Sequence, residues 1–200
     1  FVLKIFRNYN PYLVLLLLLL TVVLKLGFWT MPQAVLIESN MLLYNNVWNA
    51  VQHVLGFSTF TWGIIGMLSL FVQALYVNNI ANRFDLFTNM SYLPAFTYIA
   101  ISSIIPSWNV VGPYMVLTWF VLGILDNALR LYQVHQNRFV IVNLGVLIGL
   151  SALLLPELAI LALFGIVAIS IFRALNFGDW LAYVLGLVTP LRFLYRSVLI

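Results

Sequence analysis

The sequence predicts an all-α membrane protein: a polytopic bundle of transmembrane helices with about seven spans and one amphipathic helix at the membrane surface. Of its 200 residues, 64% are hydrophobic and only 7% are charged, against about 25% in an average globular chain. The mean hydropathy of +1.07 is typical of a protein surrounded by lipid. Because one membrane helix needs about 20 residues, a chain of this length accommodates about six or seven crossings. We expect residues 1–200 to form a single integral-membrane domain.

Apolar runs and prolines place the expected spans along the chain. The first span follows Pro11, where a missing N–H costs nothing at a helix start. The third stops at Pro106, and the sixth opens at Pro156. The last run is interrupted at Pro190, where we expect a kink or an early end. The expected spans are 11–29, 57–77, 92–105, 111–125, 139–155, 157–173 and 180–198.

Polar segments separate these spans. Residues 78–85 are expected to form a loop, and residues 127–138 a loop or a surface helix. The turn residues at 106–109 predict that the third and fourth spans pack as an antiparallel hairpin, and the fifth and sixth form a second hairpin. Asp126 and Arg130 have the i, i+4 spacing of an ion pair, which we interpret as part of a capped helix end.

The segment between the first two spans is predicted to lie along the membrane surface. Over residues 41–55, apolar side chains recur at helical spacing on one face, while uncharged polar side chains occupy the other. Aromatic residues near the ends of the spans are expected at the interface between lipid and water. They are Trp29, Tyr44, Trp48, Trp108 and Trp180.

The basic residues predict an orientation with the N-terminus in the cytoplasm of a bacterial inner membrane. That orientation places six basic residues in inner segments and none in outer loops, as the positive-inside rule expects. The six are Lys4, Arg7, Arg83, Arg130, Arg138 and Arg173. The outer loops carry Glu38 and Glu157 instead. Since the basic residues are scattered singly, they indicate membrane anchoring and not a nucleic-acid partner.

Small and polar residues inside the spans predict how the helices pack. Gly145 and Gly149, with Ala152 following, form a stripe that allows close approach of a neighbouring backbone, and we expect it to contact a partner. Lys25 lies near the end of the first span, where its long stem is expected to lift the ammonium to the headgroups. Other polar residues within the spans are expected to form interhelical hydrogen bonds. They are Gln73, Thr97, Ser102, Ser103, Thr118, Asn143 and Ser151.

Few residues in the sequence suggest chemistry. There is no cysteine, so disulfides and thiolate metal sites are excluded. Glu38, in the first outer loop, is the single weak candidate for a catalytic base, because enzymes acting on lipid-linked sugars place acidic residues in such loops. His53 and His135 are too far apart in the sequence to define a metal site. We therefore expect no cofactor and no metal.

The order of several short motifs resembles one protein family. The motifs are Phe6-Arg7-Asn8-Tyr9-Asn10-Pro11 before a leucine run, Asn82-Arg83-Phe84-Asp85-Leu86-Phe87 leading into Ser91-Tyr92-Leu93-Pro94-Ala95, Asn143-Leu144-Gly145-Val146-Leu147-Ile148-Gly149-Leu150, and Asp179-Trp180 followed by Gly186-Leu187-Val188-Thr189-Pro190. Together they look like the uncharacterised polytopic inner-membrane proteins of Bacteroidota-type bacteria, a domain of unknown function. The resemblance implies a longer protein, of which this chain is the N-terminal two-thirds, and it carries over no catalytic residues. A carotenoid-cleaving oxygenase label borne by some members does not suit a chain with two histidines, since that chemistry needs several on iron.

Three functions remain open from the sequence. The favoured one is a non-enzymatic subunit or partner of a larger membrane assembly in envelope biogenesis, secretion or motility, with other membrane proteins as partners. The second is an enzyme or flippase-like factor for polyprenyl-linked sugars, with Glu38 as base. The third is a transporter, although the centres of the spans offer few ionisable groups.

Overall fold

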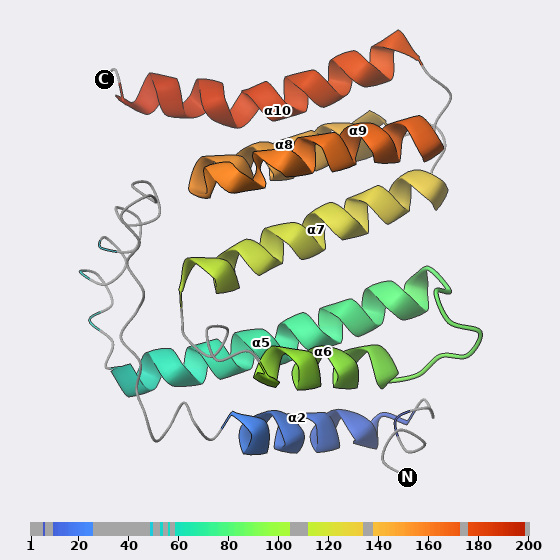
Figure 1. The fold of residues 1–200 in the computed structure, drawn as a ribbon, viewed down its shortest axis with the longest axis vertical. Helices are drawn as coiled ribbons and strands as arrows, with labels where there is room; N and C mark the ends of the chain where they lie inside the picture. The colour runs from blue at the N-terminus through green and yellow to red at the C-terminus, as the bar shows by residue number, and fades with distance from the viewer. Residues whose placement is uncertain are drawn as a thin grey trace. The chain divides into compact units, whose positions relative to one another are not determined.

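The structure is a computed structural model that describes residues 6, 10–25, 49, 53, 56, 59–104, 112–133, 138–172 and 176–198. These residues form α-helices and no β-strand, which confirms the all-α prediction (Figure 1). In chain order the elements are α2 (Tyr12–Leu24), α5 (Thr59–Arg83), α6 (Leu93–Ile104), α7 (Pro113–Gln133), α8 (Arg138–Leu154), the 3-10 helix η2 (Pro156–Ile160), α9 (Leu161–Phe172) and α10 (Phe177–Val198). The chain divides into two compact units, Phe1–Ser39 with Asn45–Val116, and Asn40–Tyr44 with Leu117–Ile200.

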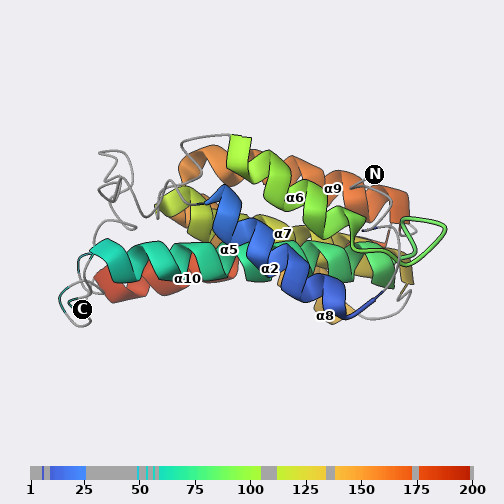
Figure 2. The same cartoon turned by 90° about the horizontal axis from the view of Figure 1, so that it is seen from below.

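In the first unit, α2, α5 and α6 enclose an apolar core. Helices α2 and α6 run parallel, since Tyr92 N at the start of α6 donates to Phe6 O ahead of α2, and Lys25 at the end of α2 reaches the last turn of α6. Helix α5 runs antiparallel to α6 (Figures 1 and 2). The rings of Phe6 and Phe96 stack with centroids 4.7 Å apart. The buried core residues are Phe6, Leu13, Leu17, Leu70, Ala74, Tyr92, Ala95 and Ile99.

The connection between α5 and α6 is fixed by hydrogen bonds at both ends. Asn82 Nδ2 donates to Ser91 O at 3.2 Å, and Ser91 N donates to Asn82 Oδ1 at 3.3 Å. Leu86 N donates to Ala81 O at 3.0 Å and closes the C-terminus of α5. This closure needs a left-handed residue, which is Asp85 with φ 49°. The two helices are therefore held as a hairpin by the connection as well as by the core.

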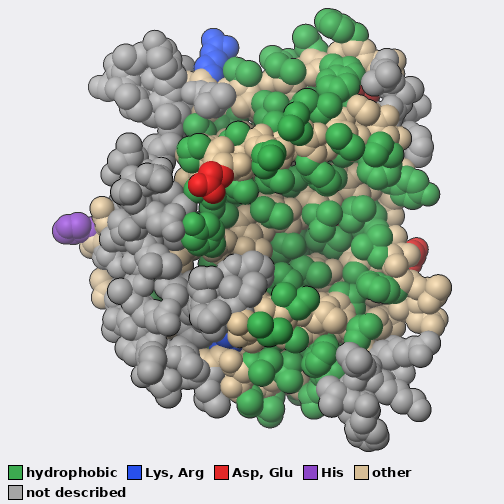
Figure 3. All heavy atoms as spheres, in the orientation of Figure 1, with side chains coloured by type: hydrophobic (Ala, Val, Ile, Leu, Met, Phe, Trp, Pro, Cys, Tyr) green, Lys and Arg blue, Asp and Glu red, His purple; other side chains and the backbone are tan. Residues whose placement is uncertain are grey.

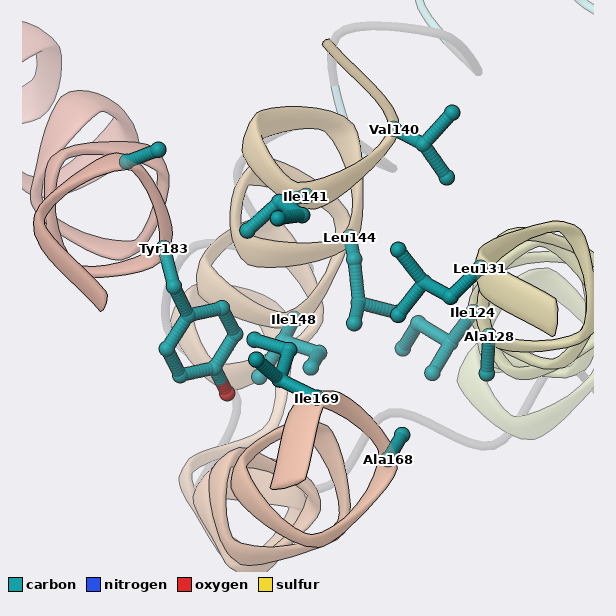
Figure 4. Close-up of a cluster of buried hydrophobic side chains, with 11 residues drawn as sticks. Ile124, Ala128, Leu131, Val140, Ile141, Leu144, Ile148, Ala168, Ile169 and Tyr183 are labelled. Atoms are coloured by element: carbon teal, nitrogen blue, oxygen red, sulfur yellow. The ribbon is translucent and has the colours of Figure 1, made fainter. Parts of the chain in front are cut away.

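In the second unit, α8 lies between the other helices. Figure 4 shows Ile141, Leu144 and Ile148 of α8 among side chains from α7, α9 and α10. Helices α8 and α9 are antiparallel and joined through η2, which begins at Pro156. Helices α8 and α10 run parallel. The buried residues of this core are Ile124, Ala128, Leu131, Val140, Ile141, Leu144, Ile148, Ala168, Ile169, Ala182 and Tyr183.

Three expectations about helix ends need correction. The loop expected at 78–85 is wrong as far as Arg83, because α5 continues to that residue, with Asn78 only 5% exposed. Helix α7 likewise continues past Asp126 to Gln133. The early end expected at Pro190 is also wrong, because α10 continues through it to Val198. Asp126 pairs with Arg130 of its own helix, and the ring of Pro190 packs against α8 at Gly149.

Several predictions lie outside the described residues. They include the turn at 106–109, the polar residues 134–137 and nearly all of the interfacial helix 41–55. Within that last segment the structure describes only Asn49 and His53, both helical and exposed.

Two of the described helices are long and apolar enough to cross a membrane. They are Phe60–Arg83, with 24 residues and a hydropathy of 1.7, and Tyr114–Gln133, with 20 residues and a hydropathy of 1.3. Four further apolar helices are shorter: Tyr12–Leu24, Leu93–Ile104, Arg138–Leu154 and Pro156–Phe172. The structure therefore supports membrane association through two helices, and the other expected spans stay predictions. Hydrophobic side chains cover much of the surface seen in Figure 3.

Candidate functional site

Lys25 is the most deeply buried charged residue among those the structure describes. It follows α2 directly, is 1% exposed, and its Nζ donates to Ser102 O at 2.9 Å. That carbonyl belongs to the last turn of α6, where backbone acceptors lack intrahelical donors and the helix dipole favours a cation. The expectation that Lys25 lifts its ammonium to the headgroups is therefore wrong. The long stem instead carries the charge inward, because the end of α6 offers it an acceptor.

A second polar contact links α5, α6 and the start of α7 within the first unit. Tyr98 OH donates to Gln73 Oε1 at 2.9 Å, and Gln73 Nε2 donates to Met115 O at 3.0 Å. Gln73 is 2% exposed, and both polar atoms of its side-chain amide form hydrogen bonds to neighbouring helices, as buried polar groups generally do. Gln73 thus forms the interhelical bonds expected of it.

The hydroxyl groups of the spans behave differently. Thr97, Ser103 and Ser151 donate to carbonyls three or four residues earlier in their own helices. Ser102 Oγ likewise donates to Ile99 O at 3.0 Å, while its carbonyl accepts from Lys25. Such back-bonding satisfies a hydroxyl without a neighbouring helix. The expectation of interhelical hydrogen bonds is therefore wrong for these four hydroxyls, whose acceptors lie in their own helices.

Ion pairs join charged residues in the described part of the second unit. Arg130 Nη2 lies 3.0 Å from Asp126 Oδ2, which is the i, i+4 pair expected from the sequence, and Arg130 belongs to the last turn of α7. Arg138 Nε lies 3.5 Å from Asp179 Oδ1 and connects the start of α8 to the start of α10. Because the Arg138 side chain is 69% exposed, this second pair contributes little to stability.

The glycines of α8 lie at the closest backbone approach in the second unit. A Cβ added at Gly145 would come 2.6 Å from Tyr183 O and 3.1 Å from Gly186 Cα. A Cβ at Gly149 would come 2.7 Å from Leu187 O and 3.1 Å from Pro190 Cγ. The glycine stripe therefore packs against the chain's own α10. The face on which we expected a partner is occupied by α10.

Tyr183 fastens α10 to α9 as well as to α8. Its hydroxyl donates to Ala162 O at 2.8 Å, and a Cβ at Gly165 would lie only 2.8 Å from Tyr183 Cζ. Figure 4 shows the ring directed between α8 and α9. Tyr183 therefore packs against a glycine on each neighbouring helix. Gly145 of α8 leaves room for its backbone, and Gly165 of α9 leaves room for its ring.

The other predicted site residues are not brought together. Glu38, His135, Trp29, Tyr44, Trp48 and Trp108 lie outside the described residues. Trp180 and Ala152 are partly buried, in α10 and α8 respectively. Within the described part of the chain, no group of three His, Asp or Glu residues could hold a metal ion.

Sequence reasoning missed the partner of the glycine stripe. Ala182, Gly186 and Pro190 follow one another at four-residue spacing on α10, and all three are buried. This small-residue spacing is the same signal that identified Gly145 and Gly149. The pairing of Arg138 with Asp179 was also missed, because 41 residues separate them and no local pattern connects them.

Comparison of the chain with protein-family models, curated proteins and solved structures finds no match. The assignment of a function therefore depends on the physical features of the chain.

Proposed function

We propose that this protein is an integral inner-membrane protein, with its N-terminus in the cytoplasm, that acts as a non-enzymatic subunit or partner of a larger membrane assembly in envelope biogenesis, secretion or motility. The observation that carries this proposal is the distribution of polarity. On α9, the side chains of Leu163 and Val167 are 62% and 52% exposed, whereas Gln73 and Asp126 are each 2% exposed. Large apolar groups outside and polar groups inside suit a lipid solvent.

The directions of the helices support repeated crossing. Helices α2 and α6 are parallel, with α5 antiparallel to α6 between them in sequence. Helices α8 and α10 are parallel, with α9 antiparallel to α8 between them. Consecutive spans of a polytopic bundle alternate in this way because each short connection returns the chain through the bilayer.

The contacts of the charged residues support a structural role for them. Lys25 holds the end of α2 against α6, Asp126 and Arg130 pair within α7, and Arg138 and Asp179 join α8 to α10. Ionisable residues in membrane segments mark substrate pathways by default. Lys25 and the pair of Arg138 with Asp179 instead connect helical elements, which favours a subunit that presents surfaces to partners.

Topology is tested by cysteine labelling, since the chain contains no cysteine of its own. Single cysteines replace Thr88, between α5 and α6, Glu157, between α8 and α9, and Val72 on the exposed side of α5. A membrane-impermeant maleimide applied to spheroplasts should label Glu157→Cys at once, Thr88→Cys only after permeabilisation, and Val72→Cys in neither case. The reverse order for the first two positions would overturn the orientation, and ready labelling at Val72 would overturn the bilayer setting.

Assembly is tested by purification in mild detergent followed by native electrophoresis and mass spectrometry. The chain should migrate as part of a larger complex with defined membrane proteins. Glu38→Gln should leave that complex unchanged, whereas an enzyme using Glu38 as base would lose turnover and accumulate lipid-linked sugar. A chain that is monomeric, with no companion protein, would refute the proposal.

A further inference from the structure

One face of α10 combines exposed apolar side chains with an exposed arginine. Leu181, Leu185 and Val188 are 52%, 58% and 46% exposed, and Arg192 is exposed beyond them. Their spacing of i, i+4, i+7 and i+11 places all four on one side of the helix. The opposite side carries Gly186 and Pro190 and packs against α8. We name the first side the arginine face of α10.

Arg192 lacks a partner among the residues that the structure describes. The ion pairs found there involve Arg130 and Arg138, and no described side chain donates to, accepts from or pairs with Arg192. The basic group therefore lies on the same face as three exposed apolar side chains. Lys25 at the end of α2 differs from Arg192, because its ammonium donates a hydrogen bond to the Ser102 carbonyl.

The depth of Arg192 follows from the register of α10, and this step depends on the proposed function, because it takes α10 to cross the bilayer. Arg192 comes 13 residues after Asp179, so it lies about 20 Å farther along the helix than the ion pair with Arg138. A hydrocarbon core of about 30 Å would place it inside the apolar layer. Since the Cα–Cβ bond leans toward the helix N-terminus, the side chain starts away from the nearer membrane edge.

We propose that the arginine face of α10 binds a membrane helix of a different protein, one that carries an aspartate or glutamate at the depth of Arg192. An arginine in lipid is costly unless it is paired with an opposite charge or reaches water. A second copy of this chain does not suit the surface, because a parallel two-fold pairing through α10 would bring Arg192 against Arg192. The apolar residues of the face would supply the packing, and the ion pair would select the partner.

The test is a charge-dependent photocrosslink in the native membrane. The photoreactive residue p-benzoylphenylalanine is placed at Leu185 on the arginine face, and at Leu163 on the exposed side of α9 as a matched control. We expect a crosslink from Leu185 to one membrane protein that has an acidic residue within its crosslinked span. Arg192→Leu should reduce this crosslink at least tenfold, and Arg192→Lys should largely retain it. Pairing Arg192→Asp with an acid-to-lysine change in the partner should restore it.

Each other outcome overturns the inference. The crosslink could form only to lipid, to a second copy of this chain, or within the same chain, which would leave its mass unchanged. It could also form to another protein and not be weakened by Arg192→Leu. Membrane levels of Arg192→Leu should equal those of the parent chain, since Arg192 makes no contact in the described part that folding requires. Labelling of Val72→Cys distinguishes failure of this inference from failure of the proposed membrane setting. If Val72→Cys is not labelled and the charge-dependent crosslink is absent, only the inference about α10 fails.

Discussion

Replacing Gly186 by alanine should destabilise the second unit, because the new methyl group would collide with the backbone of α8. Its Cβ would come 2.5 Å from Val142 O, 3.1 Å from Gly145 Cα and 3.2 Å from Val146 N. None of these atoms belongs to a flexible side chain. Restoring an ordinary contact of about 3.4 Å requires the two backbones to separate by about 0.9 Å.

A separation of that size has an estimable cost. A gap of about 0.5–1 Å forfeits a quarter to a half of each dispersion contact across an interface. Overpacking of this kind typically costs about 1–3 kcal/mol. We expect Gly186→Ala to lower the free energy of unfolding by that amount, measured by reversible denaturation with SDS in mixed micelles.

Gly63 on α5 supplies the matched control, since nothing lies within 4 Å of the position where its Cβ would be. Gly63→Ala should be neutral or should stabilise the helix by up to about 1 kcal/mol through its higher helix propensity. Gly145→Ala acts at the same crossing as Gly186→Ala, so the double variant should cost less than the sum of the two single changes. Equal effects at Gly63 and Gly186, or strictly additive costs at the crossing, would refute the reasoning.

Three further contacts give predictions of the same kind. Lys25→Glu should reduce the membrane level of the chain far more than Lys25→Met, measured by immunoblot, because a carboxylate would face the carbonyl ends of α6; similar losses for both would show that the charge does not matter. Tyr183→Phe should cost about 0.5–1.5 kcal/mol in the SDS assay, since it removes one hydrogen bond to α9 and keeps the ring; no loss would contradict the contact with Ala162. Asn82→Ala should speed amide hydrogen exchange at Ser91, because the N–H of Ser91 donates to the lost side chain, and unchanged exchange there would contradict the described connection.

The helix ends show what hydropathy predicts and what it misses. Helices α6 and α8 begin and end within a residue or two of the expected spans, because their apolar runs stop where the helices stop. Helices α5 and α7 continue past Asn78 and Asp126, where the run of apolar residues ends. Both polar residues are buried in the structure. A hydropathy scale assigns a polar residue to water, whereas a folded chain buries it against protein.

The glycine stripe shows the same limit for the candidate site. The spacing of Gly145 and Gly149 identifies a face for close packing, but not the helix that packs there. The answer depends on Gly186 and Pro190, which lie about 40 residues later and meet α8 only after α9 has reversed the chain. Pro190 also illustrates why a local rule fails: its ring packs at Gly149, and the helix continues. Non-local contacts of this sort have no signature in a short window of sequence.

The contact between Lys25 and Ser102 joins residues 77 positions apart, and this separation has a consequence for biosynthesis. A ribosome that adds about 5–20 residues each second needs roughly 4–15 s to make that stretch. During this interval the newly made first helix has no Ser102 carbonyl to receive its ammonium. The core of the first unit therefore cannot close around Lys25 until α6 has been made, although α2 is made before α5 and α6.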